Sequence, residues 1–199
     1  MKTTKSIVFI FVATLVFGMG GMAGADTFTL NSYNVSLRTV DPGLVLYSSP
    51  ILTQPTTWNL NVGQNTGWFN LFRVGTSEGV VNISDDLTHY PITVSFNWTA
   101  PSGVVPDTVT GHTFGWTIII LDGGIVDWSD SPAVFNFGSG GQFKLALEDG
   151  AFGVPGSHVI EAKLTYVSAP APVPEPATMF LLGSGLIGLA GFARRKFKK

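Results

Sequence analysis

The chain has 199 residues, no cysteine and a formal net charge of −2. The lack of cysteine excludes disulfide bonds, thiolate metal sites and cysteine nucleophiles. Seven of the eleven Lys and Arg residues lie near the two chain ends, so residues 26–168 hold four basic residues against twelve acidic ones, a net charge of −8. A segment this acidic argues against nucleic acid or anionic lipid as its partner.

The N-terminus has the pattern of a secretory signal peptide. Lys2 and Lys5 form a basic start, an apolar run follows, and Ala23 and Ala25 supply the small residues of a cleavage site. This order is typical of a segment that is recognised by the secretion translocon and then removed. We therefore predict a signal peptide over residues 1–25.

Residues 26–168 show the pattern of an all-β domain. Polar and apolar residues alternate in several short segments, and turn-forming Gly, Pro, Asn and Asp residues separate them. The clearest alternating segments are 57–62, 92–99, 143–148 and 160–166, and the run 114–121 is apolar on both faces, as in a central strand. This alternation predicts a single β-sandwich of about ten short strands, either jelly-roll or immunoglobulin-like.

No catalytic pattern is found in this segment. His89, His112 and His158 are scattered, and neither a His-Glu-x-x-His motif nor a Gly-x-Ser-x-Gly motif is present. We therefore expect the protein not to be an enzyme. A secreted glycan-active enzyme is the least favoured alternative, since it would need two carboxylates to converge in one cleft.

One acidic loop is a candidate for calcium. Asp122, Asp127 and Asp130 fall within nine residues of a Gly-rich segment, and carboxylate oxygens in loops are typical calcium ligands. No known calcium-binding pattern is present, and Asp in turns commonly accepts hydrogen bonds from backbone amides. We predict no cofactor, with calcium in this loop as the weaker alternative.

The tryptophans suggest a second function class. Trp58 and Trp98 fall on the apolar faces of their predicted strands, as core residues do. Trp128 lies between polar residues in a loop, where we expect it to be exposed, and Trp68 precedes Phe69 so that rings point to both strand faces. An exposed Trp128 would support a carbohydrate-binding module whose partner is extracellular polysaccharide.

The C-terminal segment combines a stiff linker, an apolar span and a basic end. Residues 169–173 are a Pro/Ala tether, which we expect to be extended. The uncharged stretch 177–193 would be roughly 25 Å long as a helix, the short end of what spans a bilayer. Arg194, Arg195 and Lys196 open a basic tail over residues 194–199, and such clusters stay in the cytoplasm.

This segment resembles a known sorting signal. Val173-Pro174-Glu175-Pro176, the Gly-rich stretch 180–191 and the basic residues after it are similar in order and spacing to the PEP-CTERM sorting signal, which would cover residues 174–199. The resemblance implies processing by exosortase, a membrane-embedded peptidase of Gram-negative bacteria, with Pro174, Glu175 and Pro176 as its recognition residues. It also implies transient membrane anchoring, followed by release to the cell surface or to an exopolysaccharide and biofilm matrix, where we expect a structural role.

Overall fold

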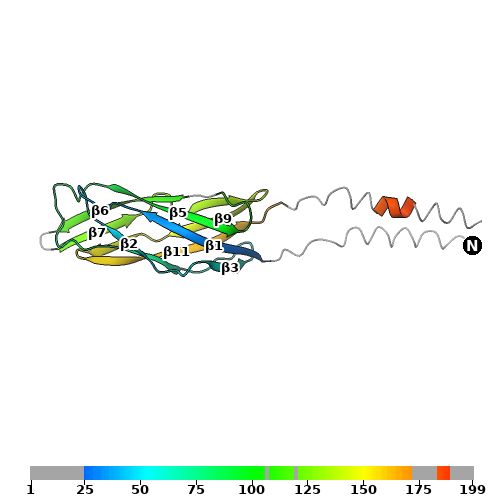
Figure 1. The fold of residues 1–199 in the computed structure, drawn as a ribbon, viewed down its shortest axis with the longest axis horizontal. Helices are drawn as coiled ribbons and strands as arrows, with labels where there is room; N and C mark the ends of the chain where they lie inside the picture. Colours follow the sequence, from blue (N-terminus) through cyan, green and yellow to red (C-terminus); the bar gives the residue numbers. More distant parts are fainter. Residues whose placement is uncertain (1–24, 106–107, 119–120, 172–182, 189–199) are drawn as a thin grey trace, which may run out of the picture.

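The computed structural model describes residues 25–105, 108–118, 121–171 and 183–188. Most of them belong to an elongated β-domain, and residues 183–188 are helical (Figure 1). The eleven strands in the described residues are β1 (Asp26–Ser36), β2 (Tyr47–Pro50), β3 (Thr56–Leu60), β4 (Phe69–Thr76), β5 (Tyr90–Ala100), β6 (Thr108–Ile118), β7 (Leu121–Asp127), β8 (Ala133–Phe137), β9 (Gly141–Leu147), β10 (Gly150–Gly153) and β11 (Gly156–Ser168).

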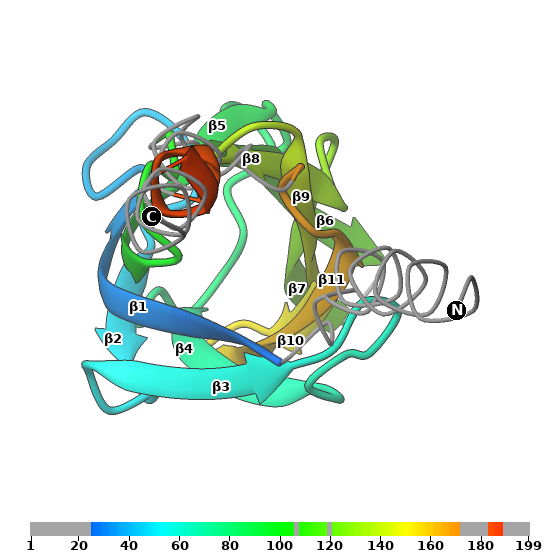
Figure 2. The same ribbon diagram turned by 90° about the vertical axis from the view of Figure 1, so that its right-hand side faces the viewer.

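The strands form two sheets. The first has the order β10-β7-β6-β5-β1-β3, and the second has the order β2-β4-β11-β9-β8. All neighbouring strands are antiparallel. Both sheets curl around a shared interior (Figure 2). The all-β prediction is therefore confirmed.

The strand faces follow the alternation in the sequence. In β5, Ile92, Val94, Phe96 and Trp98 are all buried, and the residues between them are more exposed. Alternate apolar residues of β9 and β11 face the same interior, namely Phe143, Leu145 and Leu147, and Ile160, Ala162, Leu164 and Tyr166. Since successive side chains of a strand point to opposite faces, each of these segments buries one face and leaves the other in solvent.

The apolar run 114–121 differs from its prediction. It is not one central strand, because Ile118 at the end of β6 pairs with Leu121 at the start of β7 in an antiparallel hairpin. Ile118 and Leu121 are 61% and 62% exposed. An uninterrupted apolar run predicts burial, but here it spans a reversal of the chain.

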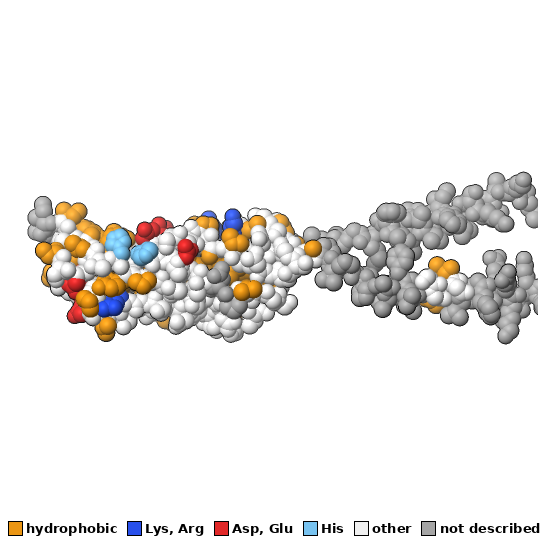
Figure 3. Space-filling view, turned by 90° about the horizontal axis from the view of Figure 1, so that it is seen from above, with side chains coloured by type: hydrophobic (Ala, Val, Ile, Leu, Met, Phe, Trp, Pro, Cys, Tyr) orange, Lys and Arg blue, Asp and Glu red, His pale blue; other side chains and the backbone are white. Residues whose placement is uncertain are grey.

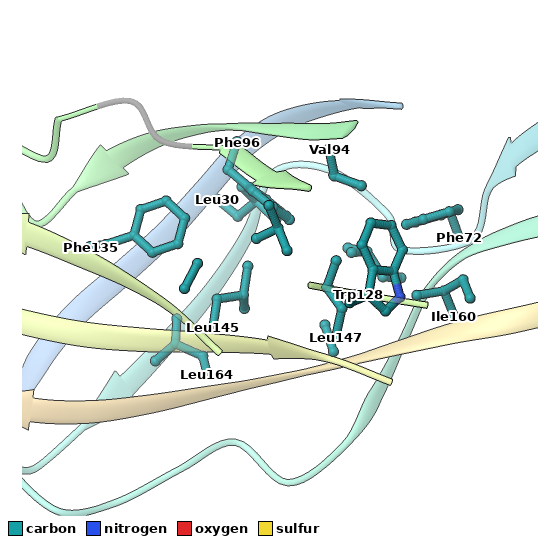
Figure 4. Packing of buried hydrophobic residues seen from close by; sticks show 14 of the residues in the cluster. Leu30, Phe72, Val94, Phe96, Trp128, Phe135, Leu145, Leu147, Ile160 and Leu164 are labelled. Atoms are coloured by element: carbon teal, nitrogen blue, oxygen red, sulfur yellow. The ribbon is translucent and has the colours of Figure 1, made fainter. Parts of the chain in front are cut away.

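Aromatic rings dominate one part of the core. Phe143 is fully buried and contacts Phe28 edge-on at 5.3 Å, while the Phe135 ring stacks on it at 4.9 Å. Figure 4 shows Phe135 and Phe96 close together, with Leu145 and Leu164 beside them. Trp98 also contacts Phe143, with 4.9 Å between the ring centroids. These rings join strands of both sheets into one hydrophobic core.

The domain has two distinct ends. β1 begins and β11 finishes at the same end, which we call the terminal end (Figure 1). There the Tyr166 hydroxyl donates a hydrogen bond to the Asp26 carboxylate, joining the last strand to the first. The opposite end, called the far end, holds the β6–β7 hairpin and the loop 77–89.

Candidate functional site

The tether begins against the terminal end. The backbone N–H of Ala171 donates to the carbonyl of Ser139 at 2.8 Å, and Pro170 packs beside Gly138. The tether therefore leaves the domain along the β8–β9 turn, on the same side as the start of β1.

Most of the residues predicted to act in sorting and cleavage lie outside the part of the chain that the structure describes. Pro174, Glu175, Pro176, Arg194, Arg195, Lys196 and the cleavage-site residue Ala23 lie outside the described residues, whereas Ala25 directly precedes β1. Of the predicted span 177–193, only 183–188 is described, and it is helical. Within the described parts of the chain, no helix has both the length and the apolar character needed to cross a membrane.

Trp128 is not the exposed ring that its polar neighbours suggest. It is only 5% exposed and belongs to the core. Its indole N–H donates to the Glu148 carbonyl at 3.0 Å, and its backbone N–H donates to the Asp149 carboxylate at 2.8 Å. Its ring meets Phe72 edge-on, and the two side chains lie close together in Figure 4. Trp128 therefore offers no face to a sugar, and that prediction is corrected.

The three predicted calcium ligands are not brought together. Asp122 and Asp127 lie at opposite ends of β7, and Asp130 accepts a hydrogen bond from a threonine hydroxyl. Hydrogen bonds from the Thr117 hydroxyl and the Val81 N–H lower the pKa of Asp122. Among the residues that the structure describes, no three His, Asp or Glu side chains form a metal-binding group. The predicted loop site is thus not assembled.

A different set of carboxylates gathers at the far end. Glu78, Asp85 and Asp86 all belong to the loop 77–89, and each accepts a hydrogen bond from a backbone N–H, two of them from the segment 37–46 between β1 and β2 and one from within the loop. The pairs are Asp85 with the Gly43 N–H at 3.0 Å, Glu78 with the Val45 N–H at 3.2 Å, and Asp86 with the Asn82 N–H at 2.6 Å. These carboxylates stabilise the loops that close this end of the core.

Burial and mutual repulsion perturb two of these groups. Burial is the main cause that raises the pKa of Glu78, and the nearby Asp86, Asp41 and Asp85 raise it further. Burial likewise raises the pKa of Asp86, with a further contribution from Asp85. One oxygen of Glu78, Oε2, is buried with no hydrogen-bond partner. Ionisation of Glu78 and Asp86 is therefore less favourable in the folded protein than in water.

Apolar side chains also gather at the far end. Val80 and Ile83 are each 70% exposed, and they belong to the same end as Ile118 and Leu121. In Figure 3, hydrophobic side chains cluster at this end, away from the chain termini. A shallow hollow nearby is lined by Phe114, by Ile125 and by two carboxylates, Asp127 and Asp149. The Asp149 carboxylate accepts a hydrogen bond from the backbone N–H of Trp128, so it stabilises the segment that carries Trp128.

The outer face of the five-stranded sheet carries most of the positive charge. Of the four cations in residues 26–168, Arg73, Lys144 and Lys163 are on β4, β9 and β11, and their side chains point away from the core. The ammonium of Lys163 lies 4.6 Å from the centroid of the Trp68 ring, and Trp68 is 46% exposed. Trp68 is thus the exposed tryptophan that the sequence suggested at position 128.

The comparisons identify the tail alone. Residues 172–196 match the PEP-CTERM protein-sorting motif. No curated protein and no solved structure matches the chain. The chain therefore carries the sorting signal of exported proteins that exosortase processes, as its tail residues predicted.

Proposed function

We propose that this protein is a structural component of the cell surface or of an extracellular polysaccharide and biofilm matrix in a Gram-negative bacterium. The observation that carries the proposal is the sorting motif at residues 172–196. The signal peptide would bring the chain to the translocon, and the C-terminal span would then hold it transiently in the membrane.

The chemistry of the tail supports processing next to the lipid. Proline disfavours helical conformations of the residue before it, so we expect Pro174 and Pro176 to present this segment to an enzyme in an extended form. Burying the charge of Glu175 in hydrocarbon is costly, which favours a position at the outer surface. Arg194, Arg195 and Lys196 would hold the other end of the span in the cytoplasm.

The domain itself fits a non-enzymatic β-sandwich role. Two sheets share one core in which most of the large residues are fully buried. The far-end carboxylates and Asp149 are hydrogen-bonded to backbone amides. These contacts support a role for the carboxylates in holding loops, and we expect no cofactor in the mature protein.

A second candidate function is carbohydrate binding. Trp68, which is 46% exposed on the outer face of the five-stranded sheet, favours it. Burying a tryptophan is strongly favourable, so a half-exposed ring in the loop just before β4, beside Lys163 of the sheet, is suited to stacking against a ligand.

Intact mass spectrometry of the surface-associated protein tests the proposed sorting. We expect a mature form that begins at Asp26 and lacks everything much beyond Pro176. Replacing Glu175 by Ala should leave the tail attached. The matched control is Glu148→Ala, an exposed glutamate of the domain, which should be processed normally. A wild-type protein that keeps residues 194–199 in a host with exosortase would contradict the proposal.

A further inference from the structure

The cations of the domain are distributed unevenly. Residues 26–168 have a net charge of −8, yet three of their four basic residues lie on the outer face of one sheet. The fourth, Arg38, is at the far end, where its guanidinium lies 4.7 Å from the Tyr90 ring and donates to the Val40 carbonyl. Glu161 of β11 lies on the same outer face, between the positions of Arg73 and Lys163, so the strands of this sheet present three cations and one carboxylate there, a net positive charge on an acidic domain.

Strand register places the key residues of that face side by side. Lys163 of β11 pairs with Ala146 of β9, and Lys144 pairs with Thr165, so the two lysines are diagonal neighbours. Diagonal neighbours of an antiparallel pair are about 7–8 Å apart. Lys163 also contacts Trp68 on its other side. Trp68, Lys163 and Lys144 therefore form a continuous surface, called here the basic face.

The lysine charges of the basic face are not neutralised by carboxylates within the described residues. Among the described residues, neither Lys144 nor Lys163 forms an ion pair, and the Lys163 ammonium lies over the Trp68 ring. Two like charges on adjacent strands repel, which costs stability. Arg73 extends the positive charge along the same face and donates to the Ser157 hydroxyl at 3.1 Å. The arrangement therefore suits an external anion better than it suits the fold.

We propose that the basic face binds an anionic polysaccharide, with Trp68 stacking on a sugar ring and Lys144 and Lys163 pairing with its carboxylate groups. This inference rests on the carbohydrate-binding function proposed above and adds the site and the ligand class. Lys163 holds one face of the Trp68 ring, and the 46% exposure of the residue leaves much of the rest open. The face runs along β11 from the position of Arg73 to that of Lys144, a length of about 20 Å that several sugar units could occupy.

Charge density favours a polysaccharide over the other anionic polymers. Duplex DNA carries one charge per ~1.7 Å, and its binding depends on many cation–phosphate contacts. Three cations on a domain of net charge −8 supply few such contacts and leave much repulsion. A polymer of sugar acids has at most one charge per sugar unit, so two or three lysines and arginines can pair with it while the ring supplies stacking.

Binding by the mature protein, purified from the surface of producing cells, tests the proposal. The probes are polygalacturonate, neutral dextran, duplex DNA and phosphatidylglycerol vesicles. We expect polygalacturonate alone to bind, and the double variant Lys144→Gln, Lys163→Gln to bind about tenfold more weakly. Trp68→Ala should weaken binding by about the same factor, and both variants should unfold at temperatures close to that of the wild type, since the replaced side chains are outside the core.

The matched control separates the face from the overall charge. Arg38→Gln removes one positive charge at the far end and should leave binding unchanged. Equal binding by the lysine double variant, or an equal loss in Arg38→Gln, would overturn the site. If neutral dextran binds and Trp68→Ala weakens that binding, the carbohydrate-binding function would stand, but the proposal that the ligand is anionic would be wrong. Binding of DNA or vesicles at least as tight as that of polygalacturonate would also overturn the class, and binding to neither polysaccharide would remove the carbohydrate-binding function as well.

Discussion

The two ends of the domain are stabilised by different physical means. At the terminal end, the rings of Phe28, Phe137 and Tyr166 pack edge-on or at a tilt, with 5.0–6.1 Å between their centroids. At the far end, carboxylates accept hydrogen bonds from the amides of loops. Burial of apolar surface depends little on pH, whereas carboxylate contacts depend on ionisation.

This difference matches how the protein is expected to be held. The tether leaves from the terminal end, where the first and last strands are joined through Asp26 and Tyr166. Any pull on the tail reaches this end first. The far end, with its carboxylates and exposed aliphatic side chains, lies at the opposite end of the domain from the start of the tether (Figure 3). The contrast predicts that mutations at the two ends will differ in size and in pH dependence.

Truncating a ring of the aromatic core should have the largest effect. Phe143→Ala removes a fully buried side chain that contacts Phe28, Phe135 and Trp98. We expect the free energy of unfolding to fall by about 3–5 kcal/mol, measured by urea denaturation. The far-end comparison is Val81→Ala, which should cost about 1.5 kcal/mol because it removes only two buried carbon atoms. Equal costs would remove the contrast between the ends.

Breaking the link between the first and last strands should have an intermediate effect. Tyr166→Phe keeps the buried ring but removes the hydroxyl that donates to Asp26. Burial and this hydrogen bond raise the pKa of Tyr166, so the hydroxyl stays protonated well into the alkaline range. We expect a loss of about 1.5–2 kcal/mol, as for hydrogen bonds to charged groups. Faster hydrogen exchange at the start of β1 should accompany it.

A second tyrosine provides the control for that link. The Tyr33 hydroxyl donates to the neutral carbonyl of Leu71 at 2.6 Å. Tyr33→Phe should cost about 1 kcal/mol, less than Tyr166→Phe, because its acceptor carries no charge. If both variants lose the same free energy of unfolding and show the same rate of amide hydrogen exchange at the start of β1, the hydrogen bond between Tyr166 and Asp26 stabilises the terminal end no more than an ordinary one.

The sequence predicted what short-range patterns determine. The alternation of apolar and polar residues identified the buried faces of β5, β9 and β11. This pattern is local, because successive side chains of any strand point to opposite faces. The sorting motif was equally readable because its residues, including Pro174, Glu175 and Pro176, are contiguous in the sequence. Both predictions needed no knowledge of distant contacts.

Predictions that depended on distant contacts were wrong or missing. Trp128 looked exposed because its sequence neighbours are polar, but Glu148 and Asp149 supply the hydrogen bonds that let it be buried. The basic face escaped notice because Trp68, Lys144 and Lys163 are far apart in the chain and meet only through strand pairing. The contacts of Glu78 and Asp85 were likewise missed, because their partners, the N–H groups of Val45 and Gly43, are more than thirty residues away in the chain.

The smallest predicted effect concerns the charge of the far end. Since the pKa of Glu78 is raised above its ordinary value of 4.5, the folded state binds more protons than the unfolded state. Stability should therefore fall as pH rises above 4.5, by the linkage between proton binding and folding. Glu78→Gln keeps an oxygen for the Val45 N–H and removes the charge. We expect the variant to match the wild type near pH 4 and to exceed it at pH 7 by less than about 1 kcal/mol. The control is Glu148→Gln at an exposed position, whose stability should stay parallel to that of the wild type across this pH range. If the wild type instead gains stability relative to Glu78→Gln between pH 5 and 7, the charge of Glu78 stabilises the far end and the prediction is wrong.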